Sequence, residues 1–512
     1  MADARAPADP DLALSAAGEA MGVTEYIEPP RRELVAEAAG VDGKDAEPFS
    51  SLVPAIIGGA LMMQTLSATV IANALPTMAR SFGEDPVRLN TTISIYLLAS
   101  AVFLPISGWM ADRFGAKRVF VIAIVAYAAA CAACGLATNL PEMLAARAFE
   151  GAAGAMMMPV GRLVLLRSTA KHNLVRAMSV LTMPALLGPV IGPPIGGLII
   201  TYGSWRWIFF LNLPIAAVGV FLVTRYIKDV REEDTAPLDW TGPVLTGLGM
   251  AAVVWGFDNL GRGPLPPWAI AALMAGGAAL LAVYAWHATR VSNAILDLNL
   301  LKIDTFYAST VGGAFLRMGM GAMPFMLAML LQVAFGLTAL QAGLMTFASA
   351  AAAIVMKTCA PPILQRFGFK RTLIANAAIV SVSFMAYALF KPGTPHWLIY
   401  AVLLTGGFFR SLQFTSLNGM AFADIDHPRM SRASTMSTMG QQLSQSMGIG
   451  IAATFLHLSR VAHHAPQLTA DIIGPAFIAV GVLSLVSVLF FVPLPANAGD
   501  ALHGGPRGGR RA

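Results

Sequence analysis

Between Leu52 and Leu494 the chain alternates long apolar stretches with short polar loops. The stretches are long enough to cross a hydrocarbon core, which takes about 20 helical residues, and no gap of soluble-domain size separates them. We expect fourteen such stretches. They are Leu52 to Met78, Leu89 to Ala111, Val119 to Thr138, Leu144 to Leu166, Val175 to Ile200, Trp207 to Tyr226, Trp240 to Phe257, Trp268 to Ala288, Phe306 to Val333, Leu340 to Ile363, Leu373 to Phe390, Trp397 to Phe422, Ser434 to Leu458 and Ile472 to Leu494. The pattern predicts an all-α polytopic membrane protein with 14 transmembrane helices.

Composition supports this prediction. Of the 512 residues, 56% are apolar and 12% are charged, whereas soluble proteins carry roughly 25% charged residues. This excludes a soluble globular enzyme as the first interpretation, and the net charge of +6 is no argument for nucleic-acid binding in a membrane protein. The three cysteines, Cys131, Cys134 and Cys359, lie in apolar stretches and are interpreted as packing residues.

The two ends of the chain differ in charge. Residues 1–50 hold eleven acidic and four basic side chains and lack a signal-peptide pattern, so they are predicted to form a disordered acidic cytoplasmic tail. Residues 496–512 are predicted to form a basic cytoplasmic tail.

Lysine and arginine give an independent test of the spans, because they concentrate on the cytoplasmic side of a membrane. With the N-terminus inside, the inner loops and the C-terminal tail hold nineteen basic residues and the outer loops hold six. A missed or invented span in the middle would invert every later loop. We therefore expect both termini on the cytoplasmic side of the cell (inner) membrane.

A short motif occurs twice. Residues 112–118 read DRFGAKR and residues 365–371 read QRFGFKR, with five of seven positions identical. Each copy lies between the second and third helices of a six-helix set, which predicts bundles at 51–230 and 296–495 joined by two inserted linker helices at 231–295. The glycines are expected to form tight turns, and the basic residues to bond helix ends or a carboxylate between the bundles, or only to obey the positive-inside rule. The predicted motif residues are Asp112, Arg113, Gly115, Lys117, Arg118, Arg366, Gly368, Lys370 and Arg371.

These residues carry a resemblance to the major facilitator superfamily. The stretch Gly108 to Arg118 resembles its loop signature, Arg147-Ala-Phe-Glu150-Gly151 resembles its Arg-x-x-Gln-Gly motif, and Gly188 to Gly197 is similar to the motif that marks its antiporters. Fourteen spans resemble the drug:proton antiporter branch of EmrB/QacA type. The resemblance implies a major-facilitator fold, exchange of substrate for protons across a gradient, and no cofactor.

The glycine-rich motif also has an interpretation from residue chemistry. Gly188, Gly192 and Gly196 lie on one helix face and permit close approach of another helix, while Pro193 can kink the span. The resemblance implies a hinge or seal formed with Gly197. Tight packing without a role in coupling is the alternative.

Charges inside a membrane are expensive, so they are functional candidates. Arg147 and Glu150 share one helix face, as an ion pair would. Relatives of this branch usually carry an aspartate where this chain has Ser67, and a glutamine where it has Glu150. Our hypothesis is that Glu150 carries the proton and Arg147 tunes it; a purely structural pair and an absence of proton coupling are the alternatives.

Two more arginines, Arg317 and Arg410, fall in the middle of spans of the second half. Together with Arg147 and Glu150 they leave the membrane core with a net charge of +2, which favours anionic or zwitterionic amphiphiles as substrates. Alternatively, these arginines bond helix carbonyls. The remaining residues expected at the substrate cavity are Met326, Phe325, Gln413, Asn418 and Ser67.

The combined prediction is a secondary active transporter, with the lipid bilayer and a small molecule as partners and no nucleic acid. An uncoupled facilitator or channel and an exporter of an anionic metabolite are the alternatives; a periplasmic adaptor is not readable. No catalytic cluster, metal spacing or phosphate-binding loop is apparent, so we expect neither an enzyme nor a metal site. Asp258 is interpreted as a marker of the membrane interface.

Overall fold

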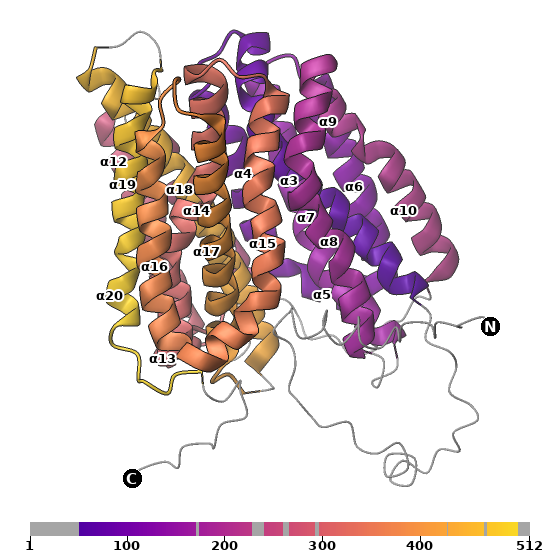
Figure 1. The fold of residues 1–512 in the computed structure, drawn as a ribbon. Coiled ribbons are helices and arrows are strands. Elements are labelled where there is room, and N and C mark those ends of the chain that lie inside the picture. The colour runs from indigo at the N-terminus through magenta and orange to yellow at the C-terminus, as the bar shows by residue number, and fades with distance from the viewer. Residues whose placement is uncertain are drawn as a thin grey trace, which may run out of the picture.

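The computed structural model describes residues 51–169, 174–227, 240–259, 266–291, 296–426, 429–464 and 468–499, and this part of the chain is helical throughout its regular structure. The predicted acidic tail and most of the predicted basic tail lie outside the described residues. Figure 1 shows the helices of the first half, coloured indigo to magenta, beside those of the second half, coloured orange to yellow. The predicted all-α class is confirmed.

The first half is built from six helical segments that correspond to the first six predicted spans. They are α3 (Leu52–Phe82), η1 with α4 and α5 (Arg88–Asn90, Thr91–Phe103 and Ile106–Phe114), α6 (Ala116–Leu136), α7 (Leu140–Ser168), α8 (Leu174–Tyr202), and α9 with α10 (Trp207–Phe210 and Asn212–Tyr226).

Two further helices, α11 (Thr241–Asn259) and α12 (Pro267–Ala288), form the inserted pair. The second half of the chain follows. Its segments are η3 (Leu298–Lys302), α13 to η5 (Asp304–Tyr307, Ala308–Gly312, Gly313–Ala328 and Met329–Ala334), α15 (Ala339–Phe367), α16 with η6 (Phe369–Ala386 and Tyr387–Leu389), α17 (His396–Phe422), α18 (Met430–Ala462), and α19 with α20 (Ala470–Leu485 and Ser487–Phe491).

Every predicted apolar stretch thus coincides with a helix, although the helices are not equally apolar. Among the described residues, nine helices are long and apolar enough to cross a membrane, or ten if the pair α4 and α5, bent by 55° around Pro105, counts as one span. Helix α7 is among the others, and it carries Arg147, Glu150 and Arg162. The count of fourteen crossings stays a prediction.

The two copies of the repeated motif define one end of the bundle, which we call the motif end; the opposite end is the far end. In both copies a glycine links two helices in a backbone conformation with positive φ, 91° at Gly115 between α5 and α6, and 73° at Gly368 between α15 and α16. Only glycine adopts such angles without strain. The predicted glycine turns are therefore confirmed.

The halves meet most extensively along two seams. Helix α8 packs along α15, and α4 packs along α18. The inserted pair covers the second seam, because α11 contacts both α4 and α18. An apolar cluster fills this junction, with Leu98 and Ala101 of α4, Met250 and Val254 of α11, and Met439 of α18.

Candidate functional site

A buried ion pair lies on α7, in the interior of the first half. Arg147 Nη1 donates to Glu150 Oε2 over 2.7 Å, and both side chains are fully buried. The spacing of three residues places both on one face of the helix, as the sequence predicts. Because a charge in the membrane interior costs several kcal/mol, about 2.5 to 3.5 on insertion scales, this pair has to be stabilised by its surroundings.

Three donors converge on the Glu150 carboxyl group. Ser67 of α3 donates to Oε1 over 2.8 Å, and the thiol of Cys134 on α6 lies 3.4 Å from Oε2, which already accepts from Arg147. Two acceptor oxygens that face three donors form the environment of a carboxylate. Ser67 occupies the position of the family's usual aspartate, so the structure brings that position into direct contact with the acid of α7.

The guanidinium of Arg147 is held from α4. Its Nε donates to the Thr92 carbonyl over 3.0 Å, and its Cζ lies 4.3 Å from the centre of the Tyr96 ring. A cation over an aromatic face is stabilised by the ring quadrupole. The Nη2 atom has no hydrogen-bond partner among the described residues. The pair therefore sits where α3, α4, α6 and α7 meet.

Sequence reasoning missed part of this cluster. Gln64 of α3 donates to the Gly154 carbonyl over 3.0 Å and reaches the Tyr96 hydroxyl at 3.4 Å, and Tyr127 of α6 is fully buried nearby, against Gly154. For Cys134 the sequence alone predicts only packing, whereas its thiol contacts Glu150. Each of these residues looks apolar or incidental in its own helix, and no single-helix pattern relates it to Glu150.

A second buried cation, Arg317 of α14, lies in the interior of the second half and is 1% exposed. Its Nη1 donates to the Ser309 carbonyl over 2.8 Å, and its Nη2 to Asn418 Oδ1 of α17 over 3.3 Å. Ser309 belongs to a π-helical turn, Ala308–Gly312, and such turns are frequent at functional sites. Within the described part of the chain, Arg317 has no ion pair and its Nε has no partner.

The other residues expected at a substrate cavity are spread over the second half. Arg410 donates to Ser349 of α15 over 2.8 Å. Gln413 is fully buried, accepts from Asn376 of α16 over 2.7 Å and donates to the Leu373 carbonyl. Phe325 and Met326 are fully buried in the core. The structure thus brings Arg317 and Asn418 together.

The glycine-rich face of α8 packs closely, as its spacing predicts. A Cβ added to Gly188 or Gly192 would lie 2.2 Å from Thr65 Oγ1 or 2.4 Å from Thr69 Oγ1, both on α3. Gly197 faces the other half, because a Cβ there would lie 2.5 Å from the Ala339 carbonyl oxygen of α15. The Pro193 carbonyl accepts from Asn73 over 3.2 Å. The motif therefore lies where α3, α8 and α15 come together.

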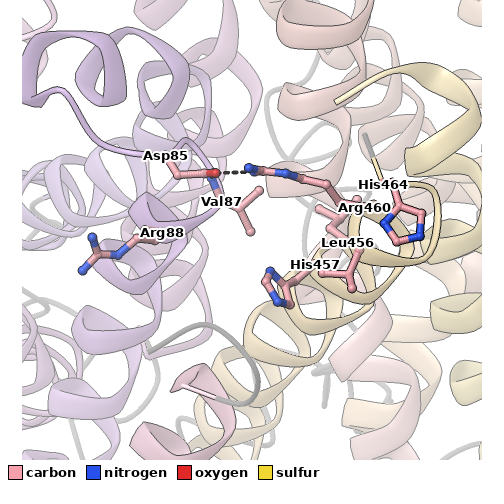
Figure 2. Close-up of a pocket in the computed structure, with 8 residues that line it drawn as sticks. Asp85, Val87, Arg88, Leu456, His457, Arg460 and His464 are labelled. Atoms are coloured by element: carbon pink, nitrogen blue, oxygen red, sulfur yellow. Dashed lines mark hydrogen bonds and ion pairs between the residues drawn. The ribbon is translucent and has the colours of Figure 1, made fainter. Parts of the chain in front are cut away.

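At the far end the two halves are joined by an ion pair. Asp85, in the loop before α4, pairs with Arg460 of α18. Figure 2 shows the two side chains pointing toward each other across a pocket of about 410 Å³, lined also by Val87, Arg88, Leu456, His457, Val461 and His464. Both charged side chains are partly exposed.

Further hydrogen bonds join the halves toward the same end. Gln332 of η5 donates to the Asn73 carbonyl over 3.0 Å, and the Leu340 backbone N–H donates to Thr201 Oγ1 over 3.0 Å. At the motif end, Arg113, Arg366 and Arg371 are exposed, and Lys117 bonds the Thr224 carbonyl at the end of α10 in its own half. The structure therefore holds the two halves together at the far end.

In the part of the chain that the structure describes, no three histidine, cysteine or acidic side chains are grouped so that they could bind a metal ion.

Comparisons with known proteins agree with this architecture. The model of the Major Facilitator Superfamily matches residues 57–449 and, in a second match, 309–509. Multidrug resistance protein MdtD of Cronobacter sakazakii is 36% identical over 423 residues, which are 81% of this chain and 87% of that protein. Its counterpart in Yersinia enterocolitica is 34% identical over 452 residues, or 87% and 95% of the two chains.

A crystal structure of a D-xylose-proton symporter has the same fold, with a TM-score of 0.62, 13% identity, and coverage of 88% of this chain and 98% of that one. The helical architecture, a glycine turn in each copy of the loop motif and a match over most of the length lead to one conclusion. The chain belongs to the major facilitator superfamily and is a membrane transporter, not an enzyme.

Proposed function

We propose that this protein is a proton-coupled exporter of small amphipathic compounds that works by alternating access between its two halves. The names of its relatives, which refer to multidrug resistance, support export of such compounds. The observation that carries proton coupling is Glu150, a carboxyl group with no exposed surface that is held by donors from α3, α6 and its own helix α7.

Proton exchange follows from this geometry. When Glu150 takes up a proton, its attraction to Arg147 falls and one oxygen changes from acceptor to donor, so the hydrogen bonds from Ser67, Cys134 and Arg147 must rearrange. Because these partners belong to α3, α6 and α7, the rearrangement shifts helix packing within the first half. Loss of the proton on the opposite side of the membrane restores the arrangement seen in the structure.

The basic residues favour one orientation. The positive-inside rule places the motif end, with both copies of the basic loop, on the cytoplasmic side of the inner membrane, and both chain termini with it. The far end, where Asp85 and Arg460 pair, then faces outward. In this proposal the structure represents the state that is closed to the outside, with Glu150 ionised after its proton has left toward the cytoplasm.

The substrate site is assigned to the second half, around Arg317 and Asn418. A buried guanidinium without an ionised partner in the described residues is stabilised by an anionic or strongly polar group of a ligand. The helices around this site are then packed by Phe325, Met326, Gln413 and Arg410. The glycine-rich face of α8 acts as the hinge. No cofactor is required, since the proton gradient supplies the energy.

The decisive experiment measures exchange in inverted membrane vesicles. Glu150→Gln keeps the size and polarity of the side chain but cannot titrate, so pH-gradient-driven transport should fall at least about 100-fold, while counterflow of labelled substrate without a gradient continues. Glu142→Gln, an exposed acid in the first turn of the same helix, serves as the matched control and should leave both rates unchanged. Gradient-driven transport at the wild-type rate in Glu150→Gln would contradict the assignment.

A further inference from the structure

The inserted helix α11 buries an acid at the seam between the two halves. Met250, Val254 and Asp258 follow at intervals of four residues, so they lie on one face of the helix, and they are 5%, 1% and 7% exposed. The first two belong to the apolar cluster with α4 and α18. The third position of this face, toward the far end, is a carboxyl group, which is costly there and is by default a functional candidate.

Asp258 contacts both halves of the transporter. Ser94 of α4 donates its hydroxyl to Asp258 Oδ1 over 3.4 Å. On the other side, a Cβ added to Gly450 of α18 would lie 2.5 Å from the same oxygen, so the glycine leaves the room that the carboxyl group occupies. The interpretation of Asp258 as a mere marker of the membrane interface therefore misses its contacts.

The same serine joins the halves directly. Ser446 of α18, one helical turn before Gly450, donates its hydroxyl to the Ser94 carbonyl over 3.0 Å. Ser94 and Ser446 are both fully buried. Ser94 thus accepts a hydrogen bond from the second half through its backbone carbonyl and donates one to the inserted pair through its hydroxyl. These two hydrogen bonds link the first half, the second half and the inserted pair.

Alternating access requires this seam to open. If the far end separates, α18 moves away from α4, and α11 can follow only one of them. The Asp258 carboxyl group must then lose either its bond with Ser94 or its close packing on Gly450. The contact that is lost stabilises the state with a closed far end and is absent from the state with an open far end.

We propose that Asp258 is a positioning residue of the transport cycle, which holds the α4–α18 seam closed at the far end through Ser94, and that the inserted pair thereby sets the balance between the two access states. The inference rests on the proposed alternating-access function. It gives the two inserted helices a part in the cycle, in place of simple contact with lipid.

The test measures opening without measuring transport. Val87, 5% exposed, lines the far-end pocket with Leu456 of α18 (Figure 2), so Val87→Cys places a thiol where reagent arrives when the far end opens. The labelling rate of purified full-length protein in a Cys359→Ala background is followed by mass spectrometry. Cys131 and Cys134 are buried. Asp258→Ala should raise the labelling rate about three- to tenfold, the range expected for loss of one buried hydrogen bond.

Three further variants make the result specific. Ser94→Ala, which removes only a hydroxyl, should accelerate labelling in the same direction. Combined with Asp258→Ala, it should add little, because the two substitutions delete the same bond. Gly450→Ala should also accelerate labelling by displacing the carboxyl group. Gly276→Ala on α12, where an added Cβ meets no atom within 4 Å, is the matched control and should label at the original rate.

Unchanged labelling in both Asp258→Ala and Ser94→Ala would overturn the proposal, as would fully multiplicative effects in the double variant. Thermal unfolding of each variant separates opening of the seam from loss of the fold, and Ser94→Ala remains informative if Asp258→Ala does not assemble. Labelling does not depend on substrate or pH gradient. A failure of gradient-driven export in the unmodified protein would therefore refute the proposed function while leaving this test intact.

Discussion

The two halves of this transporter each bury an arginine, but the groups that surround the two guanidinium groups differ. Arg147 in the first half has an acid three residues away, an aromatic ring against its guanidinium and a backbone carbonyl at its Nε. Arg317 in the second half has one carbonyl and one amide oxygen, and no ion pair within the described part of the chain. Both are nearly inaccessible to solvent.

This difference separates two tasks. A buried ion pair that is complete within the protein can change its protonation without a ligand, which suits a coupling site. A buried cation that lacks an ionised partner gains stability when a ligand supplies one, which suits a binding site. We therefore propose that the first half responds to protons and the second to substrate, and the following changes would break or sharpen that division.

The largest effect is expected from removal of the acid alone. Glu150→Leu leaves Arg147 buried without its partner and should lower the free energy of unfolding by about 3 to 5 kcal/mol. The double variant Arg147→Met, Glu150→Leu replaces both charges with apolar groups and should recover most of that loss, although it remains inactive in proton-driven transport. Denaturation in detergent measures both; equal destabilisation of the single and double variants would show that the pair is not a self-contained unit.

The equivalent change in the second half should act on binding. Arg317→Met removes a cation that has no ion pair in the described residues, so the free energy of unfolding should stay unchanged or rise. Affinity for an anionic amphiphile should fall by about 1.5 to 3 kcal/mol, the range for hydrogen bonds to charged groups, and affinity for a cationic one should not fall. Equilibrium binding to a matched anionic and cationic pair of compounds decides this. Equal losses for both compounds would end the assignment of Arg317 to an anionic group.

A smaller effect is expected at Ser67. Ser67→Ala removes the donor to Glu150 Oε1 and leaves that oxygen buried without it, which should cost about 1 to 2 kcal/mol of stability and slow gradient-driven transport. Ser107→Ala is a control in the same half, because among the described residues its hydroxyl bonds only the Leu104 carbonyl, in the bend just before α5. A Ser67→Ala protein as stable and as active as the Ser107→Ala protein would remove Ser67 from the coupling site.

The smallest effect concerns an ion pair outside the spans, between Asp297 and Arg429 at the motif end. Partial burial raises the pKa of Asp297, but hydrogen bonds from Arg429 and from the Asn299 backbone outweigh it and hold this pKa below its usual value of 3.8. The pair therefore stabilises the fold fully above about pH 4 and loses its contribution as pH falls through the lowered pKa.

Thermal unfolding as a function of pH measures this contribution. Because Arg429 is one-third exposed, the pair should contribute no more than about 1 kcal/mol, and Asp297→Asn should remove that part of the acid-induced loss. An Asp297→Asn protein with the original pH dependence would show that other acids dominate it.

Much of the architecture could be predicted from hydrophobic pattern, because a bilayer imposes helix length and apolarity on each span. Helices were found at all fourteen predicted places, and both glycine turns of the repeated motif have the backbone angles that glycine alone tolerates. The pairing of Arg147 with Glu150 could also be predicted, since it depends on spacing within one helix.

Contacts between helices were beyond the sequence. Ser67 and Glu150 are separated by 83 positions, and Ser94 and Ser446 by 352, and no periodicity of either segment relates them. For Cys134 and Asp258 the sequence predicts only packing and a position at the membrane interface, because a thiol in an apolar helix and an acid near a helix end are ordinary features on their own. Their meaning comes from the helix that packs against them.

The sequence by itself determined that this chain is an all-helical membrane protein and which charges lie within its apolar helices, because those properties follow from transfer free energies and local spacing. Only the tertiary structure decided which of those charges is satisfied within the protein, which end joins the halves, and that the inserted pair places an acid at their seam. These depend on contacts between distant segments, where a few tenths of an ångström separate a hydrogen bond from a mere neighbour.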